Sequence, residues 1–229
     1  ATHRVIDAGY VVKLPDNVST ELAASIMLKG LTVAYLIRDS FKVEAGHTVL
    51  FHAAAGGVGL IAGQWLNALG ATVIGTAGGA DKCALAKANG YHHVIDYKSA
   101  DFEAEVMKLT DGKGVDVTYD SVGNDTMARS LTSTRRHGTI IAFGQSSGPY
   151  LDFKITDLAK GSYKLSRPTL FHFAGERDWL EANAAKLFTA VTDGTVTISI
   201  NQKFALEDVA KAHDALTGRA TTGCTILTV

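Results

Sequence analysis

The sequence has 229 residues, 46% of them hydrophobic and 20% charged, which is the composition of an ordinary soluble globular protein with a sizeable core. Its formal net charge of −1 gives no reason to expect nucleic acid or an anionic membrane as a partner. We find no apolar run of the ~20 residues needed to cross a bilayer and no apolar core of a secretory signal, so we expect a cytoplasmic protein.

The first 40 residues predict one strand and one long helix. Residues 5–14 are apolar and strand-like, and they end at a turn over residues 15–17. Ser19 then caps a helix over residues 21–37, which we expect to be broken near Gly30. Because a lone strand without partner strands is unusual at the start of a complete domain, we expect the chain to be a fragment.

A glycine-rich turn is the most informative motif. Residues 48–51 are apolar and β-branched, which predicts a buried strand, and residues 60–70 show helical apolar spacing closed by a glycine. Between them, Ala54, Gly56 and Gly59 match A-x-G-x-x-G, the dinucleotide fingerprint with alanine in place of its first glycine. A further strand follows at once and completes a β-α-β unit, so the turn predicts a dinucleotide site.

The glycines of this turn have separate physical roles. Gly56 and Gly57 let the backbone come close to a pyrophosphate, and Gly59 lets the helix lie tightly on the strand. The helix N-terminus offers N–H groups to the phosphates. The alternative interpretation is a tight turn that uses small residues and binds nothing.

The end of the second strand, residues 71–76, indicates which cofactor is bound. NAD sites usually carry a carboxylate there for the ribose 2′-hydroxyl, but this chain has Thr76 and Ala77, followed by Lys82. NADP(H) is therefore favoured over NAD(H). Alternatively, Lys82 is a solvated lysine on the first turn of the next helix, partly neutralised by Asp81.

The strand–helix alternation continues along the chain. The pattern predicts helices over residues 81–89, 101–109 and 126–132, and strands over residues 93–97, 115–119 and 139–143. About six strands alternating with such helices mean a doubly wound parallel sheet, the Rossmann α/β arrangement. Beyond it, the pattern predicts a strand over 162–165, helices over 176–192 and 206–216, and a strand over 225–229.

Polar and small residues gather where the predicted strands end. Ligands of open parallel sheets bind at the carboxyl ends of the strands. The candidate clusters are the glycine turn and residues 96–97, 120–123 and 143–148, in which Ser121, Ser146, Ser147 and Tyr97 offer hydrogen bonds or stacking. Each of them, taken alone, is equally well interpreted as a simple turn.

Other chemistries lack their motifs. The eight histidines and two cysteines show no metal-ligand spacing, so they imply neither zinc nor a disulfide. There is no Gly-x-Ser-x-Gly hydrolase elbow, and no Gly-Lys-Ser/Thr follows the glycine turn as a Walker loop requires.

Six segments together resemble the NADPH:quinone oxidoreductases, the zinc-independent, zeta-crystallin-like branch of the medium-chain dehydrogenase/reductase superfamily. The matching segments are KGLTVAYL (29–36), HAAAGGVG (52–59), YDSVG (119–123), FGQSSG (143–148), RPTL (167–170) and GRATTG (218–223). The resemblance runs from end to end and in the order of that family.

The resemblance implies a set of cofactor contacts. Gly56, Gly57, Val58 and Gly59 would hold the pyrophosphate, Lys82 the 2′-phosphate and Tyr97 the adenosine side; Ser121, Phe143, Gly144, Gln145 and Ser146 would lie along the ribose and nicotinamide; Thr32 would approach the nicotinamide; and Arg219 would reach back from the final segment. The implied cofactor is NADPH, without a metal.

The resemblance also implies an activity and a domain plan. The expected reaction is hydride transfer from nicotinamide C4 to a quinone-like small molecule, in a homodimer paired through an edge strand near residues 163–165. Residues 22–195 would form the dinucleotide-binding domain. Residues 1–21 and 196–229 would be remnants of a GroES-like catalytic domain whose front is missing, so we expect weak or no activity from this chain. Reduction of an activated C=C bond and a non-catalytic NADPH-binding module are the alternatives.

Overall fold

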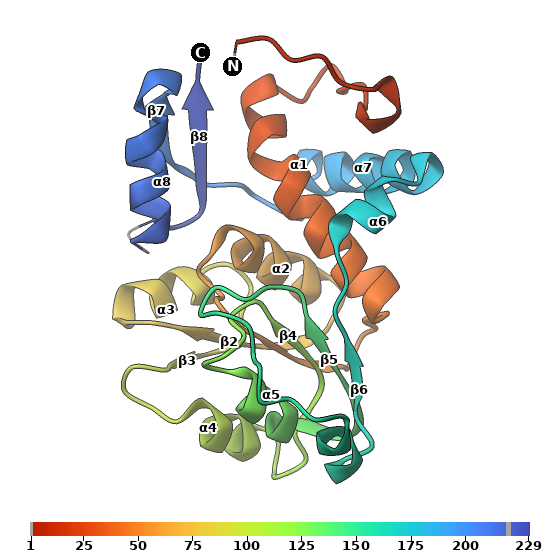
Figure 1. The fold of residues 1–229 in the computed structure, drawn as a ribbon, viewed down its shortest axis with the longest axis vertical. Coiled ribbons are helices and arrows are strands. Elements are labelled where there is room, and N and C mark those ends of the chain that lie inside the picture. Colours follow the sequence, from red (N-terminus) through yellow and green to blue (C-terminus); the bar gives the residue numbers. More distant parts are fainter. Residues whose placement is uncertain (1, 219–220) are drawn as a thin grey trace.

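Six parallel strands form the central sheet in the computed structural model, which describes residues 2–218 and 221–229 (Figure 1). Their order is β3-β2-β1-β4-β5-β6, the order of the Rossmann fold. The strands are β1 (Thr48–Phe51), β2 (Thr72–Ala77), β3 (His93–Asp96), β4 (Val115–Asp120), β5 (Thr134–Ala142) and β6 (Lys164–Ser166). The predicted fold class is therefore confirmed.

Helices cover both faces of this sheet. Figure 1 shows α2 (Gly57–Ala68) and α3 (Ala80–Lys87) on one face, and α4 (Phe102–Leu109) and α5 (Met127–Ser133) on the other. The remaining helices are α1 (Thr20–Tyr35), α6 (Leu170–Ala174), α7 (Arg177–Thr192) and α8 (Val209–Thr217), with short helical turns at η1 (Ala8–Tyr10), η2 (Leu36–Ser40), η3 (Ile155–Lys160) and η4 (Leu206–Asp208).

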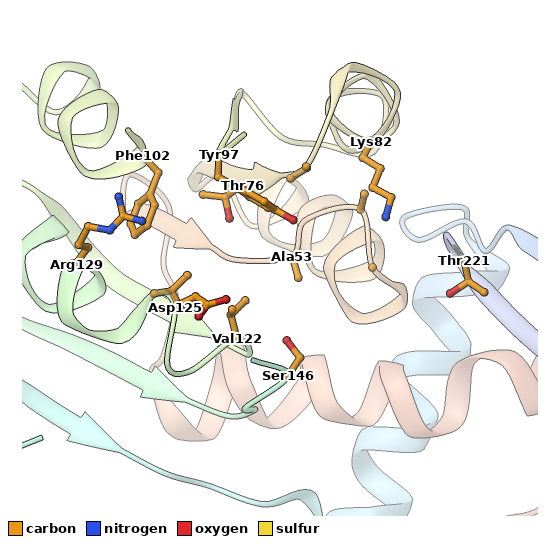
Figure 2. Close-up of a pocket in the computed structure, with 15 residues that line it drawn as sticks. Ala53, Thr76, Lys82, Tyr97, Phe102, Val122, Asp125, Arg129, Ser146 and Thr221 are labelled. Carbon is orange, nitrogen blue, oxygen red and sulfur yellow. The ribbon is translucent and has the colours of Figure 1, made fainter. Parts of the chain in front are cut away.

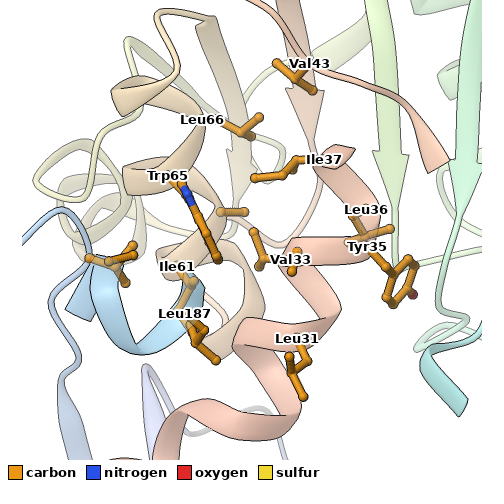
Figure 3. Close-up of a cluster of buried hydrophobic side chains, with 14 of the residues drawn as sticks. Leu31, Val33, Tyr35, Leu36, Ile37, Val43, Ile61, Trp65, Leu66 and Leu187 are labelled. Atoms are coloured by element: carbon orange, nitrogen blue, oxygen red, sulfur yellow. The ribbon is translucent and has the colours of Figure 1, made fainter. Parts of the chain in front are cut away.

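The largest hydrophobic cluster lies where α1, α2 and α7 meet over the sheet (Figure 3). Ser19 caps α1 as predicted, since its hydroxyl accepts a hydrogen bond from Leu22 N at 3.1 Å. The expected break near Gly30 is wrong, because α1 runs through it. A Cβ on Gly30 would come within 2.4 Å of a methyl of Leu187, so this glycine serves the close approach of α7.

Residues 5–14 do not form the predicted strand. Apart from η1 they are irregular, and Val5 is fully exposed. A strand is stabilised by its ladder of backbone hydrogen bonds, and no strand of the described chain pairs with this segment. Its apolar pattern therefore does not correspond to a β-strand in the structure.

The segment Thr20–Ser40 is long and apolar enough to cross a membrane, contrary to the expectation that no such run exists. Within the fold, however, 56% of its most apolar window is buried, and its buried side chains belong to the core. The core helix of a soluble domain passes the same length and composition test, so this feature is weak evidence for a membrane span.

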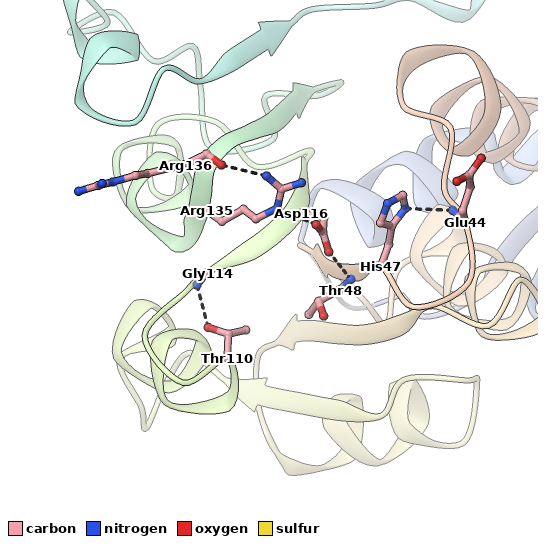
Figure 4. A network of polar contacts seen from close by, with 8 residues as sticks. All are labelled: Glu44, His47, Thr48, Thr110, Gly114, Asp116, Arg135 and Arg136. Atoms are coloured by element: carbon pink, nitrogen blue, oxygen red, sulfur yellow. Dashed lines mark hydrogen bonds and ion pairs between the residues drawn. The ribbon is translucent and has the colours of Figure 1, made fainter.

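Asp116 ties three strands together at the amino edge of the sheet (Figure 4). One carboxylate oxygen accepts a hydrogen bond from Thr48 N at 2.7 Å, and the other accepts one from Arg135 Nε, also at 2.7 Å. These contacts join the start of β1 to β4 and β5. The Asp116 network therefore lies at the edge of the sheet opposite to the carboxyl ends of the strands.

Residues near the C-terminus form a separate two-stranded sheet of β7 (Ile200–Ala205) and β8 (Cys224–Thr228). The predicted strand over residues 225–229 corresponds to β8. The sequence pattern did not predict β7, although its residues alternate between half-buried and exposed. In Figure 1 this small sheet and α8 lie apart from the central sheet.

Candidate functional site

A cavity of about 330 Å³ opens at the carboxyl edge of the central sheet. Its walls come from the ends of β1 and β2, the loop after β3, the first turns of α3 and α4, and the β4–α5 and β5 loops (Figure 2). The lining residues include Ala53, Gly56, Thr76, Lys82, Tyr97, Phe102, Val122, Asp125, Thr126, Arg129, Ser146 and Thr221. Four of them, Gly56, Lys82, Tyr97 and Ser146, are predicted site residues.

The glycine-rich turn brings backbone to this cavity. Ala53 has a φ of 55° in the left-handed region, and its carbonyl accepts a hydrogen bond from Gly56 N at 2.9 Å. A Cβ on Gly59 would lie 2.4 Å from the Ala53 oxygen, so the predicted reason for this glycine, tight packing of helix on strand, is present in the structure. Among the described residues, no side chain caps the N-terminus of α2. Its first backbone N–H groups are therefore able to bind an anion such as a phosphate.

The end of β2 carries no carboxylate and lies near a lysine, as the sequence predicts. Thr76 and Ala77 close that strand without a carboxylate, and Lys82 lies on the first turn of α3 in the same cavity. Figure 2 shows Arg129 on the opposite side from Lys82. Asp125 is the one carboxylate among the described lining residues, and it is exposed.

Tyr97 closes the cavity beside the β2–α3 turn. It is 48% exposed, and its hydroxyl lies so close to Gly78 that a Cβ there would come within 2.5 Å of it. Asp96 holds the same turn, because its carboxylate accepts a hydrogen bond from Gly79 N at 2.9 Å. This bond and a second one from Lys98 N lower the pKa of Asp96.

The loops after β4 and β5 pack directly on each other. Ser146 N donates a hydrogen bond to the Ser121 carbonyl at 3.1 Å, and a Cβ on Gly144 would lie 2.7 Å from that same oxygen. Ser146 reaches the cavity, whereas Gln145 is exposed and does not line it. The prediction that these strand ends share one edge is therefore confirmed.

Thr32 and Phe143 lie at a second, more open cavity of about 460 Å³ with Arg167 and residues 168–170. Tyr35 also lines it, and burial raises the pKa of this phenol to about 12. The structure thus brings Thr32 and Phe143 together but separates them from the cavity that holds Lys82 and Tyr97.

Two further predicted residues lie outside both cavities, and a third cannot be placed. Gly57 faces Lys29 and the Gly223 carbonyl, which a Cβ would meet at 2.7 and 2.8 Å. Val58 is half-buried against the main core. Arg219 lies outside the described residues.

Sequence reasoning missed the wall formed by Phe102 and Arg129. The guanidinium carbon lies 4.3 Å from the centre of the Phe102 ring, a cation–π contact within the cavity wall. Phe102 is the first residue of α4, and Arg129 lies on α5. They are 27 positions apart in the sequence, so only the fold brings them together. No motif in the sequence links them.

No group of three or more His, Cys, Asp or Glu side chains in the described part of the chain has the arrangement of a metal site. A dinucleotide with phosphates fits the residues present better, because an uncapped helix N-terminus and two cationic side chains meet at a cavity at the strand ends.

Comparison with known proteins agrees with this geometry. Residues 57–186 match the family model of the zinc-binding dehydrogenases. A quinone oxidoreductase of Pseudomonas aeruginosa is 45% identical over 218 residues, which are 95% of this chain and 67% of that protein. The chain belongs to the quinone oxidoreductase family. Members of this family are oxidoreductases, and they belong to the medium-chain dehydrogenase/reductases.

Two further relatives are informative about the substrates and the cofactor found in this family. A 2-haloacrylate reductase from a Burkholderia species is 40% identical, over 98% of this chain and 68% of that protein. The crystal structure of the Escherichia coli quinone oxidoreductase complexed with NADPH superposes with a TM-score of 0.93 at 41% identity, over 95% of this chain and 68% of that one.

Proposed function

We propose that this chain binds NADPH and that the protein reduces quinone-like acceptors by hydride transfer from nicotinamide C4. The observation that carries the proposal is a single cavity in which the uncapped N-terminus of α2 and Lys82 lie together, while Thr76 and Ala77 take the place of a carboxylate. A 2′-phosphate is compatible with a lysine there and would be repelled by an aspartate. The relatives named above supply independent support.

Each predicted site residue has a role in this proposal. Gly56, Gly57, Val58 and Gly59 form the pyrophosphate turn, Lys82 pairs with the 2′-phosphate, and Tyr97 covers the adenosine side. Ser121, Phe143, Gly144, Gln145 and Ser146 follow the ribose and nicotinamide, Thr32 approaches the nicotinamide, and Arg219 completes the site from the C-terminal segment. Support comes from the position of Lys82 and Tyr97 in one cavity and of Thr32 and Phe143 in the next.

The bound cofactor supplies the hydride, so the protein contributes position and charge. Thr32 and Phe143 at the second cavity would orient the nicotinamide. Arg167, exposed at the same cavity, would stabilise negative charge that develops on an acceptor oxygen, and water would supply the proton.

The domain plan belongs to the same proposal. Residues 22–195 form the dinucleotide-binding domain, and residues 1–21 and 196–229 belong to a catalytic domain; the separate β7–β8 sheet supports this division. The three-residue edge strand β6 is the surface through which we propose that two copies pair.

A second candidate is the reduction of an activated C=C bond, which the 40% identity to a 2-haloacrylate reductase favours. Both reactions use the same cofactor site and differ in the acceptor. The third hypothesis for the same cavity is that it binds NADPH without catalysing a reaction.

Turnover separates these three functions. NADPH oxidation by the chain is followed with a panel of quinones and with a panel of α,β-unsaturated acids and ketones. Faster oxidation with the quinones supports the proposal, and faster oxidation with the alkenes supports the second candidate. Binding of NADPH without oxidation in either panel would show that this chain by itself acts as a binding module, in line with the weak or absent activity that we expect from it.

A further inference from the structure

A continuous chain of buried polar side chains lies behind the wall of the first cavity. Asp120, Ser130 and His52 are fully buried, and Thr76 is 2% exposed. Ser130 Oγ lies 2.7 Å from Asp120 Oδ2, His52 Nε2 lies 3.0 Å from Ser130 Oγ, and His52 Nδ1 lies 2.9 Å from Thr76 Oγ1. These hydrogen-bonded side chains thus join the ends of β1, β2 and β4 to α5.

The direction of these hydrogen bonds follows from Asp120. Its carboxylate also accepts from Val122 N and Gly123 N at 2.8 and 2.9 Å, and from the Thr126 hydroxyl. Every partner is a donor, which is the pattern of an ionised carboxylate. The Ser130 hydroxyl therefore donates its proton to Asp120 and has only lone pairs left for His52 Nε2.

His52 is consequently fixed as one tautomer. Its Nε2 carries the proton and donates to Ser130, so its Nδ1 is an acceptor and the Thr76 hydroxyl donates to it. Burial lowers the pKa of His52 and so favours the neutral ring; the Asp120 carboxylate opposes this shift, and the Arg129 guanidinium adds to it.

The same histidine supports a second part of the cavity wall. Its ring meets Phe102 edge-on, with ring centroids 4.9 Å apart, and Phe102 in turn carries Arg129 on its face. Asp120 holds the backbone of Val122 and the side chain of Thr126. These four contacts, and the one from His52 to Thr76, end on residues that line the first cavity. The side-chain partners of His52 are Thr76, Ser130 and Phe102, and none of them lines the second cavity.

We propose that His52 is a positioning residue for the adenosine half of the bound dinucleotide. It acts through Thr76 and Phe102, and the Ser130–Asp120 pair fixes its orientation. This inference rests on the proposed function, since it assigns the first cavity to adenosine and the second to nicotinamide. Loss of His52 weakens binding of adenosine phosphates and leaves the binding of a nicotinamide mononucleotide unchanged.

The test compares the binding of NADPH with the binding of its two halves. Dissociation constants for NADPH, 2′,5′-ADP and reduced nicotinamide mononucleotide are measured for the wild-type chain, His52→Leu and His52→Gln. Leucine leaves two buried hydroxyls without their partner, so we expect about tenfold weaker binding of NADPH and 2′,5′-ADP. Glutamine keeps a donor and an acceptor at the site, so we expect it to restore most of this affinity. Reduced nicotinamide mononucleotide binds all three proteins alike.

Thr118→Val is the matched control. Thr118 and Thr134 are buried, their hydroxyls lie 2.8 Å apart, and neither lines the cavity. Its substitution also removes a buried hydroxyl from the sheet, but we expect nucleotide affinity to stay unchanged. Equal losses in Thr118→Val and His52→Leu would overturn the proposal, because they would mark a general effect of stability.

A tautomer measurement is independent of any variant that fails to fold. Nitrogen chemical shifts of the wild-type His52 ring should show a neutral imidazole with its proton on Nε2. A proton on Nδ1, or on both nitrogens at neutral pH, would overturn the proposal. So would wild-type affinity for 2′,5′-ADP in a folded His52→Leu. Failure of the wild-type chain to bind NADPH would instead reject the proposed function, and this inference with it.

Discussion

The phenolic oxygen of Tyr97 lies over Gly78, in the turn that leads from β2 into α3. A Cβ added to Gly78 would approach this oxygen to 2.5 Å and the ring carbon Cζ to 2.8 Å. Tyr97 can close the cavity only because the residue beneath it has no side chain. The turn and the ring therefore form one unit of the proposed adenosine site.

Substitution of Gly78 should act through Tyr97. In Gly78→Ala the new methyl group displaces the half-exposed ring, and we expect about threefold to tenfold weaker NADPH binding with little change in thermal stability. The measurement is a fluorescence titration of Gly78→Ala, Tyr97→Ala and the double variant. The double variant should bind no more weakly than Tyr97→Ala, and additive losses would contradict the account.

Two glycines at helix contacts should differ in their effects. A Cβ on Gly59 meets backbone atoms of Ala53 and Ala54, whereas a Cβ on Gly30 meets the buried Leu187 side chain. We expect either alanine variant to lower the free energy of unfolding by about 2 kcal/mol or more, as overpacking does. Only Gly59→Ala should also weaken NADPH binding, since it alone displaces the turn. Urea unfolding and nucleotide titration check both; weakened binding in a folded Gly30→Ala would contradict this assignment.

Local pattern was sufficient for the central sheet. Strands such as residues 48–51 are short apolar runs bounded by turns, and the parallel Rossmann order follows from their alternation with helices. The glycine turn, Lys82 and Tyr97 also follow from sequence, because a strand end fixes which edge of the sheet a residue reaches. The structure brings Lys82 and Tyr97 into one cavity, as their positions after β2 and β3 predict.

Features that depend on distant contacts could not be predicted. The apolar residues 5–14 resemble a strand locally, but a strand also needs a neighbour, and sequence pattern does not supply one. Gly30 resembles a helix break, and only the approach of Leu187 shows why a glycine is needed there. Arg129 joins the site through Phe102, which precedes it by 27 residues, and no local motif links the two.

Burial of a neutral His52 should make stability depend on pH. Its pKa lies below the ordinary value of 6.5, which the unfolded chain retains. Between the two values the unfolded state binds more protons, so the free energy of unfolding rises with pH. This contribution is complete above about pH 6.5 and is lost as the pH falls toward the folded pKa, by at most about 1.4 kcal/mol per pH unit.

Urea unfolding at several pH values between about 5.5 and 7.5 measures this slope. His52→Gln should flatten it. His93→Gln is the control on a less buried histidine: burial lowers its pKa too, so its substitution should remove a smaller part of the slope. Identical slopes in the wild-type chain and His52→Gln would mean that His52 does not titrate as the structure indicates.

The most direct test of the account is a titration of the chain with NADPH and with NADH, followed by nicotinamide fluorescence. Lys82→Ala is measured alongside, with Lys87→Ala as the control, since Lys87 lies on the same helix but outside the cavity. We predict that the wild-type chain prefers NADPH by about tenfold or more, that Lys82→Ala removes this preference, and that Lys87→Ala keeps it. Equal affinity for the two nucleotides in the wild-type chain, or an unchanged preference in Lys82→Ala, would contradict the assignment of this cavity to NADPH.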